Sequence, residues 1–436
     1  MNGNNFPTIK ILNTVNEAWS RSFYRDHWGC SINDALSLIK KGRFNELPVI
    51  RKTDISKNWS ELIEYGDFTD VVSSSGTTGR PVDLPVHRLQ EAVWIESVSK
   101  VLIELGAKPG DKLLQMLSNN DMFTLGPLVW QAAKKLGVGP FRCSPQRIKR
   151  IVDVIHYHRP KFVAGNPVVM MNLSETMGDE FPDASDLPDY AYFGACGSFD
   201  SSNKLTPVAQ KVKELWWLKD VLNEYGCSEI GSIGHECLSH SGFHINDEVV
   251  YVELIDPNTG LPAKAGSTGE VVVTSLSVPR GFIAVRYATG DIASWIDYEP
   301  CSCGRRTPRL GAIIGRVDHK LKILGQTVFP DLIFDAIDSV NGLEDALIVR
   351  FSDKKSEQVE LLVAGNTHDS EALKLEIKCA LEKSIAVSPS IRNVPADLIQ
   401  KLKDDKMSMG NGVKVPRLID LDEPSSRAFL NERAVS

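Results

Sequence analysis

The sequence lacks the marks of several large classes of protein. No apolar run approaches the roughly 20 residues that a membrane helix needs, and the N-terminus has no charged start followed by an apolar core. Lysine and arginine (49) are fewer than aspartate and glutamate (56), which leaves a net charge of −7 and no general attraction to nucleic acid. We therefore expect a cytoplasmic protein with no secretory leader and with neither a membrane nor a nucleic acid as partner.

Cysteine is sparse and scattered, which argues against a disulfide framework. The eight thiols lie far apart in the sequence except for Cys301 and Cys303, which a single residue separates. The default interpretation is a set of reduced thiols in the cytosol, and the close pair is a candidate metal site.

The stretch SSSGTTGRP, residues 73–81, has the composition of a phosphate-binding loop but fits neither GxxxxGK[ST] nor GxGxxG. Gly76 and Gly79 allow the positive φ that turns successive backbone N–H groups toward one anion, and Arg80 adds a forked cation. Further donors are the hydroxyls of Ser73, Ser74, Ser75, Thr77 and Thr78. A polar surface turn would look similar, so the rest of the chain must decide between the two interpretations.

The chain of 436 residues is too long for one ordinary core. From about residue 70, short strand-like runs such as KLLQML, KFVAG and YAYFGA alternate with longer helix-like stretches, which predicts an α/β class with mixed sheets covered by helices. We expect a large N-terminal domain over residues 1–315, with a β-rich subdomain at about 245–315. Residues 316–436 have strand–helix–strand–strand–helix order and predict a small α+β domain.

Four later segments follow the loop in order. YGCSE (225–229) ends in a carboxylate beside a hydroxyl, a plausible partner for Mg²⁺, and RYATGD (286–291) places a carboxylate where ribose hydroxyls could donate to it. GRVDHKLKILGQTVFP (315–330) joins the two expected domains, and VKVPRLID (413–420) carries a lysine near the C-terminus. Each segment alone is compatible with an ordinary loop or a solvated charge.

Together these segments resemble the acyl-adenylate-forming superfamily, which includes acyl- and aryl-CoA synthetases, luciferase and peptide-synthetase adenylation domains. The closest likeness is to phenylacetate–CoA ligases, through ELPVIRKTDI (46–55), SSSGTTGRP, YGCSEIGSIGHEC, YATGD and PCSCGRRTPRLGAIIGRVDHKLKILGQTVFP. The resemblance covers nearly the whole chain. It implies that a carboxylate attacks the α-phosphate of MgATP to give an acyl-adenylate and pyrophosphate. The small C-terminal domain, a mobile lid, then rotates and the thiol of CoA displaces AMP.

The resemblance also assigns roles to residues. The catalytic residues that it implies are Lys414 at the α-phosphate, Glu229 at Mg²⁺ and Arg316. The ATP-binding residues are Ser74, Ser75, Gly76, Thr77, Thr78, Gly79 and Arg80 around the phosphates, Gly194, Ala195, Tyr225 and Gly226 around adenine, Ser228 beside the metal, and Asp291 and Arg316 at the ribose. Asp318 is the expected hinge, and Gly325 is expected to line the thiol channel.

Three departures from the family pattern stand out. Ser228 replaces the usual threonine and keeps its hydroxyl, whereas Cys196 and Gly197 stand where an acidic residue and a proline are common. Val413 replaces the glycine that normally precedes the C-terminal lysine, so Lys406 is the alternative to Lys414.

A second metal site is expected around the close thiol pair. Cys301 and Cys303 could bind one ion across a tight turn, with Cys237 and either His244 or His240 from HECLSHSGFH completing a Cys₃His set. Such a set suits structural Zn²⁺, and we place His244 ahead of His240. The alternative is a group of buried thiols and surface histidines without a metal.

The acid is expected to be aryl, because the candidate lining residues are aromatic: Trp130, Phe141, Tyr192, Phe193 and Phe199. Two other functions stay open. The enzyme could instead pass its acyl group to a carrier-protein thiol or an amine in a biosynthetic pathway, or the chain could be an inactive nucleotide-binding regulatory homologue. A homodimer is an option that the resemblance allows.

Overall fold

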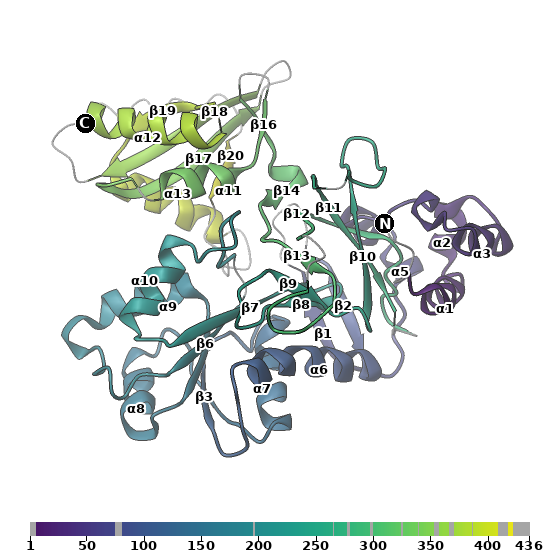
Figure 1. Ribbon diagram of the computed structural model, residues 1–436, viewed down its shortest axis with the longest axis horizontal. Coiled ribbons are helices and arrows are strands. Elements are labelled where there is room, and N and C mark those ends of the chain that lie inside the picture. The colour runs from purple at the N-terminus through teal and green to yellow at the C-terminus, as the bar shows by residue number, and fades with distance from the viewer. Residues whose placement is uncertain are drawn as a thin grey trace. The chain divides into compact units, whose positions relative to one another are not determined.

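A computed structural model describes most of the chain, in two compact units that comprise residues 1–312 and 313–436 (Figure 1). The described residues are 6–74, 81–194, 197–264, 266–276, 280–296, 300–323, 326–338, 340–352, 357–365, 370–385, 387–408 and 417–421. Helices occur together with sheets that contain parallel and antiparallel strands, so the predicted α/β class is confirmed. Within the described ranges, no helix combines the length and the apolar character needed to cross a membrane.

The largest sheet of the first unit is mixed. In the order β13-β9-β8-β7-β6-β5-β3-β4, the strands from β7 to β4 are parallel and those from β7 to β13 are antiparallel. Their bounds are β3 (Lys112–Gln115), β4 (Gly139–Arg142), β5 (Phe162–Gly165), β6 (Tyr190–Phe193), β7 (Asp220–Cys227), β8 (Gly231–His235), β9 (Phe243–Ile245) and β13 (Arg309–Leu310). The parallel strands are short and apolar because helices cover both of their faces.

One face of this sheet packs on α8 (Ile148–His158), α9 (Pro167–Met177) and α10 (Pro207–Leu215). Ala191 and Phe193 of β6 point into that core. Asn166 and Thr206 cap α9 and α10 with their side chains, and each helix begins with proline, which has no N–H to leave unsatisfied. The short 3₁₀ turn η2 (Gly178–Glu180) follows α9.

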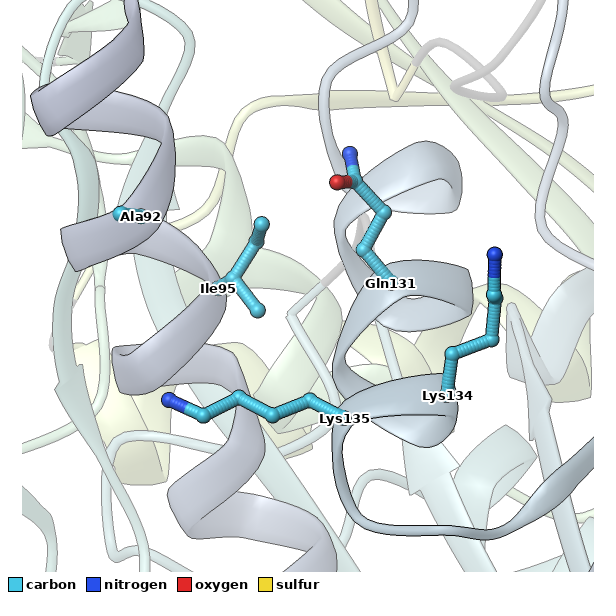
Figure 2. A pocket seen from close by; sticks show the side chains of 5 residues that line it. All are labelled: Ala92, Ile95, Gln131, Lys134 and Lys135. Carbon is cyan, nitrogen blue, oxygen red and sulfur yellow. The ribbon is translucent and has the colours of Figure 1, made fainter.

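The opposite face is covered by α6 (Arg88–Glu104) and α7 (Leu125–Lys135), which pack against each other. Figure 2 shows a pocket between these helices, with Ala92 and Ile95 on one side and Gln131, Lys134 and Lys135 on the other. Long polar side chains bridge the helices there, since the amide of Gln131 donates to the carboxylate of Glu91 over 2.8 Å. None of the residues that line the pocket is a predicted site residue.

The N-terminal segment consists of α1 (Thr8–Ala18), α2 (Ser22–Trp28), α3 (Ile32–Lys40), η1 (Phe44–Glu46), α4 (Lys52–Lys57) and α5 (Trp59–Leu62). The hairpin of β1 (Phe68–Ser73) and β2 (Asp83–His87) follows it. A second antiparallel sheet places β11 (Thr268–Ser275) between β10 (Val250–Ile255) and β12 (Tyr287–Ser294).

A buried arginine joins the N-terminal segment to β12. The residue is Arg286, which has a φ of 52° and donates to the carbonyls of Asn45, over 2.7 Å, and Leu47. Its Nε also lies 3.0 Å from the carboxylate of Glu253 on β10. The backbone N–H of Ile50 donates to the carbonyl of Arg286 over 3.0 Å. These contacts fix the start of the strand that carries the RYATGD segment.

The second unit is a small α+β fold around the sheet β19-β18-β17-β20. Its elements are β14 (Gly315–Arg316), η3 (Val317–His319), β15 (Leu321–Ile323), β16 (Gln326–Val328), α11 (Pro330–Ile337), β17 (Leu343–Ser352), β18 (Glu357–Gly365), α12 (Ser370–Ile385), β19 (Ser390–Asn393), α13 (Ala396–Ser408) and β20 (Leu418–Leu421). Alternate residues of β17 face opposite cores, so Ile348 packs with α11 and α12 whereas Leu347 packs with α13.

Candidate active site

A glycine lies at or near the end of each of the parallel strands β6 and β7. Gly194 follows β6, and a Cβ at this position would lie 2.5 Å from Cδ2 of Leu125. A Cβ on Gly226, near the end of β7, would lie 2.3 Å from the carbonyl oxygen of Gly231. Only glycine therefore fits at these positions without movement of the neighbours. The two ends share one edge of the sheet, where ligands of α/β proteins bind, and Ala195 lies outside the described residues.

A hydrogen bond brings two predicted nucleotide-binding residues together. The phenol of Tyr225 donates to Oδ2 of Asp291 over 2.9 Å and lies 3.4 Å from the hydroxyl of Thr289. The N–H of Asp291 donates to the same threonine hydroxyl over 3.1 Å. Burial, with the nearby carboxylate, holds the pKa of Tyr225 well above its ordinary value, so the phenol keeps its proton.

The predicted Mg²⁺ ligand lies beside a chain of hydroxyl groups. Glu229 is buried, and Ser228 before it donates from Oγ to the carbonyl of Ser73 over 3.1 Å. Thr124, just before α7, in turn donates to Oγ of Ser228 over 2.8 Å. The sequence does not predict a role for Thr124, because no local pattern marks a threonine that hydrogen-bonds to a residue more than a hundred positions away.

The strand before the phosphate loop is tied to its surroundings. Ser73 donates its N–H to the carbonyl of Met122 over 2.8 Å. Ser74 is buried and exchanges two bonds with Val82, since its N–H donates to that carbonyl over 3.0 Å and its Oγ accepts from that N–H over 2.9 Å. Ser74 is thus placed at the base of the loop. Residues 75–80 lie outside the described residues, so their contact with phosphate stays a prediction.

The second unit carries the remaining predicted residues. Arg316 ends β14, and its Nε lies 3.5 Å from Oδ1 of Asp318 in η3. Gly325 and Lys414 lie outside the described residues. The ribose, hinge, channel and catalytic roles of these four residues therefore stay predictions.

Four predicted metal ligands meet at one place in the first unit. Each of Cys237, His244, Cys301 and Cys303 offers an atom, and these atoms all lie within 4.8 Å of one another. The sulfur atoms of Cys237 and Cys301 are 3.6 Å apart, and Nε2 of His244 lies 3.5 Å from the sulfur of Cys303. Thr307 binds the other ring nitrogen of His244 over 2.9 Å, which leaves Nε2 directed at the thiols.

These separations suit a tetrahedral zinc ion. Bonds of about 2.3 Å to sulfur and about 2.0 Å to nitrogen give edges of roughly 3.8 Å between two sulfurs and roughly 3.5 Å between sulfur and nitrogen. Two of the donor pairs have these separations, 3.6 and 3.5 Å, and all four donor atoms lie within 4.8 Å of one another. The donor set and the oriented imidazole therefore fit the metal that the sequence predicts.

The alternative ligand, His240, has other partners. Its Nε2 lies 2.9 Å from Oδ1 of Asp220, and its Nδ1 lies 3.9 Å from Oε1 of Glu236. The hydrogen bond that His240 donates to Asp220, together with the nearby Glu236 carboxylate, raises the pKa of His240 to about 9. An imidazolium has no lone pair for a metal, so the structure favours His244 over His240 as the ligand.

Comparison with known proteins gives the chain a set of relatives. No family model matches it. The phenylacetate–coenzyme A ligase of Thermus thermophilus is 30% identical over 295 residues, which cover 65% of this chain and 63% of the relative, just under two thirds of its length. The phenylacetate–coenzyme A ligase of Pseudomonas putida is 28% identical over 310 residues, which cover 69% and 67% of the two chains.

A solved structure matches almost the whole chain. A 2-hydroxyisobutyryl-CoA ligase in its postadenylation state superposes with a TM-score of 0.80 over 98% of this chain and 91% of that one, at 19% identity. At this identity the likeness is one of fold, and it includes residues on both sides of the division between the two units.

Proposed function

We propose, from the premise that the chain is a member of the acyl-adenylate-forming superfamily, that it is an acid–thiol ligase. It would activate a carboxylic acid with ATP, release pyrophosphate, and transfer the acyl group to the thiol of CoA. The observation that carries the proposal is the convergence of Gly194, the Tyr225–Asp291 pair and the Ser228–Glu229 pair around the end of β7 and the base of the phosphate loop.

Adenylation needs positioning and charge neutralisation more than a nucleophilic side chain. A carboxylate oxygen of the acid attacks the α-phosphorus, and the bond from that phosphorus to pyrophosphate breaks. Glu229, supported by Ser228 and Thr124, would hold Mg²⁺, which neutralises phosphate charge when bound. Tyr225 would orient Asp291 toward the ribose. Lys414 would stabilise the charge that develops between the carboxylate and the α-phosphate.

The second step would use the same site after the lid has rotated about Asp318. The sulfur of CoA attacks the acyl carbon, the bond from that carbon to AMP breaks, and the thiol proton leaves with solvent. Rotation would move Lys414 out of the site and bring the segment around Gly325 to the thiol. Separate residues would then serve the two half-reactions.

The Cys₃His cluster would hold structural Zn²⁺. The ion would join β9, the segment around Cys237 and the turn that carries Cys301 and Cys303. It would stabilise this part of the first unit without entering the reaction. We also propose a cytoplasmic location, because two sulfurs as close as those of Cys237 and Cys301 stay reduced most readily in a reducing compartment or on a metal.

ATP–pyrophosphate exchange with a panel of aryl, aliphatic and amino acids, each with and without CoA, tests the proposal. We expect an acid-dependent exchange and a CoA thioester from the same acid. Exchange without a thioester would instead support a carrier-protein thiol or an amine as acceptor. ATP binding with no exchange for any acid would support the inactive homologue and contradict the ligase.

A further inference from the structure

A side chain in the turn before α10 holds the backbone at the end of the first unit. Oδ1 of Asn203 accepts the N–H of Ala312 over 2.8 Å, although the two residues are 109 positions apart. Ala312 is 4% exposed, so its N–H cannot turn to bulk water if this bond is lost. The second unit begins at the next residue, so the bond fixes the point from which the chain enters the expected lid.

The turn that carries Asn203 is closed by hydrogen bonds of its own. The N–H groups of Ser202 and Lys204 donate to Oδ1 of Asp200 over 2.8 and 2.9 Å. The N–H of Asp200 donates in return to the carbonyl of Lys204 over 2.7 Å, and the N–H of Asn203 donates to the carbonyl of Asp200 over 2.9 Å. These bonds close the turn without Ala312, so the bond to Ala312 is an addition to it.

The backbone conformation of Asn203 shows what its side chain contributes. The φ of Asn203 is 58°, in the left-handed region that glycine adopts at no steric cost and that asparagine tolerates better than most residues. Glycine would therefore serve the turn at least as well. What asparagine adds is the acceptor for Ala312, so the side chain contributes to the long-range bond and not to the turn.

The residue before Ala312 is bonded to a different segment, the end of β12. Gly311 donates its N–H to the carbonyl of Ser294, the last residue of that strand, over 2.9 Å. A Cβ on Gly311 would lie 3.4 Å from Oγ of Ser294 and 3.7 Å from Oδ1 of Asn203, so the three residues pack together. Two consecutive residues, Gly311 and Ala312, are thus held by two separate segments of the first unit. We call these two residues the lid root.

Both of the segments that hold the lid root continue from residues expected to bind the nucleotide. The chain runs from Gly194, expected at adenine, into the turn of Asn203, and Asp291, expected at the ribose, lies on β12 together with Ser294. A nucleotide that orders either segment therefore acts on the lid root through one hydrogen bond each.

We propose that Asn203 is a positioning residue that ties the lid root to the nucleotide-binding segments, so that bound nucleotide fixes the point from which the lid rotates. The proposal rests on the proposed function. Adenylation and its reversal in pyrophosphate exchange need one position of the lid, whereas thioester formation needs a rotation in every turnover. Loss of the Asn203–Ala312 bond therefore affects the reaction that includes rotation.

Three variants separate the bond from the turn. Asn203→Gly keeps the left-handed backbone and removes the acceptor, Asn203→Asp keeps an acceptor, and Lys204→Gly adds the same glycine freedom beside an intact acceptor. We expect Asn203→Gly to slow CoA thioester turnover about fivefold, the effect of one ordinary hydrogen bond, and to change pyrophosphate exchange and the KM for ATP less than about twofold. Asn203→Asp and Lys204→Gly should match wild type in both assays. An equal loss in both assays for Asn203→Gly would overturn the proposal.

Amide hydrogen–deuterium exchange reports on the lid root without turnover. Peptides that contain Ala312 are followed in wild type and in Asn203→Gly, with and without MgATP, and peptides from α3 serve as the internal reference. We expect MgATP to slow deuterium uptake at Ala312 severalfold in wild type and to have no effect there in Asn203→Gly. Uptake in wild type that is the same with and without MgATP would contradict the proposal, because a purely structural bond protects Ala312 whether or not nucleotide is bound.

The two measurements separate failure of this proposal from failure of the proposed function. Protection of Ala312 by MgATP that is lost in Asn203→Gly, without pyrophosphate exchange for any acid, would contradict the ligase and sustain the role of Asn203. Thioester formation together with deuterium uptake that ignores MgATP would contradict the role of Asn203 and sustain the ligase.

Discussion

Tyr225 and Asp291 are 66 residues apart in the chain, yet the phenol of one donates to the carboxylate of the other over 2.9 Å. One residue comes from the strand that ends the parallel half of the large sheet, and the other comes from the second sheet. The bond therefore joins the two sheets at the edge where the proposed nucleotide site lies. It also fixes the direction of a carboxylate that is expected to meet ribose hydroxyls.

Tyr225→Phe should raise the KM for ATP roughly tenfold or more with little change in kcat, because the loss of one hydrogen bond to a charged group costs about 1.5–3 kcal/mol. Steady-state kinetics at saturating acid measures this. Tyr24→Phe is the control, since the buried Tyr24 hydroxyl donates to the carbonyl of Ile283. Tyr24→Phe should lower the Tm and leave the KM for ATP unchanged. An equal rise in KM for both variants would contradict a specific role for Tyr225.

Thr124→Val should weaken the use of Mg²⁺. The change keeps the shape of the side chain but removes the donor to Ser228, and the hydroxyl chain beside Glu229 loses its first member. We expect the Mg²⁺ concentration for half-maximal exchange to rise about fivefold. Thr14→Val removes a comparable buried bond, to the carbonyl of Ser275 over 2.7 Å, and should leave that concentration unchanged. An unaltered Mg²⁺ requirement in Thr124→Val would argue against the assigned metal site.

Zinc should be present in one equivalent and should depend on the cluster. Protein purified without chelators should contain it by elemental analysis, whereas Cys301→Ser should contain little and should melt several degrees lower, because a structural ion stabilises only the folded chain. Cys379→Ser, at an exposed thiol, should behave as wild type. Metal-free wild-type protein with an unchanged Tm would rule the ion out.

Lys414→Ala should slow adenylation roughly 100-fold or more, since it removes a cation at the point where charge develops. Thioester formation from a supplied acyl-adenylate should fall much less. Single-turnover measurements of the two half-reactions give the comparison, with Lys406→Ala as the control on the alternative lysine. Equal losses in both half-reactions would contradict a lid that changes position between them.

The pH dependence of stability should report on Glu224. Its pKa is about 7 in the folded chain against an ordinary 4.5, so between these values the folded state holds a proton that the unfolded state has released. The free energy of unfolding should therefore fall as pH rises from about 4.5 to 7.

Gln at position 224 cannot titrate in the Glu224→Gln variant. The free energy of unfolding of the variant should therefore fall less steeply with pH than that of wild type, by up to about 1.4 kcal/mol per pH unit. Urea unfolding of wild type and variant at pH 5, 6 and 7 measures the difference in slope. Glu236, whose pKa is also raised to about 7, contributes to both proteins alike and cancels. Parallel slopes would mean that Glu224 titrates normally when folded.

Much of the fold was open to prediction because its signals are local. The short runs KLLQML, KFVAG and YAYFGA predict β3, β5 and β6, and the runs of β-branched residues after residue 245 predict the second sheet. The resemblance of YGCSE to the family motif implies the roles of Tyr225 and Glu229, and these roles stay predictions.

The rest of the site depends on contacts between distant segments. Nothing near Thr124 in the sequence marks its bond to Ser228, and nothing near Tyr192 marks Glu224 as its neighbour. The preference for His244 over His240 likewise comes from the partners that each ring meets in space, Asp220 for His240 and the thiols for His244.

The bond from Arg286 to Asn45 spans 241 residues, and it has a consequence for how the protein is made. The ribosome releases the N-terminal helices well before β12 is translated. The carbonyl groups of Asn45 and Leu47 therefore lack their arginine donor while most of the first unit is still being translated. Asn45 and its neighbours are thus synthesised well before the arginine that they bind.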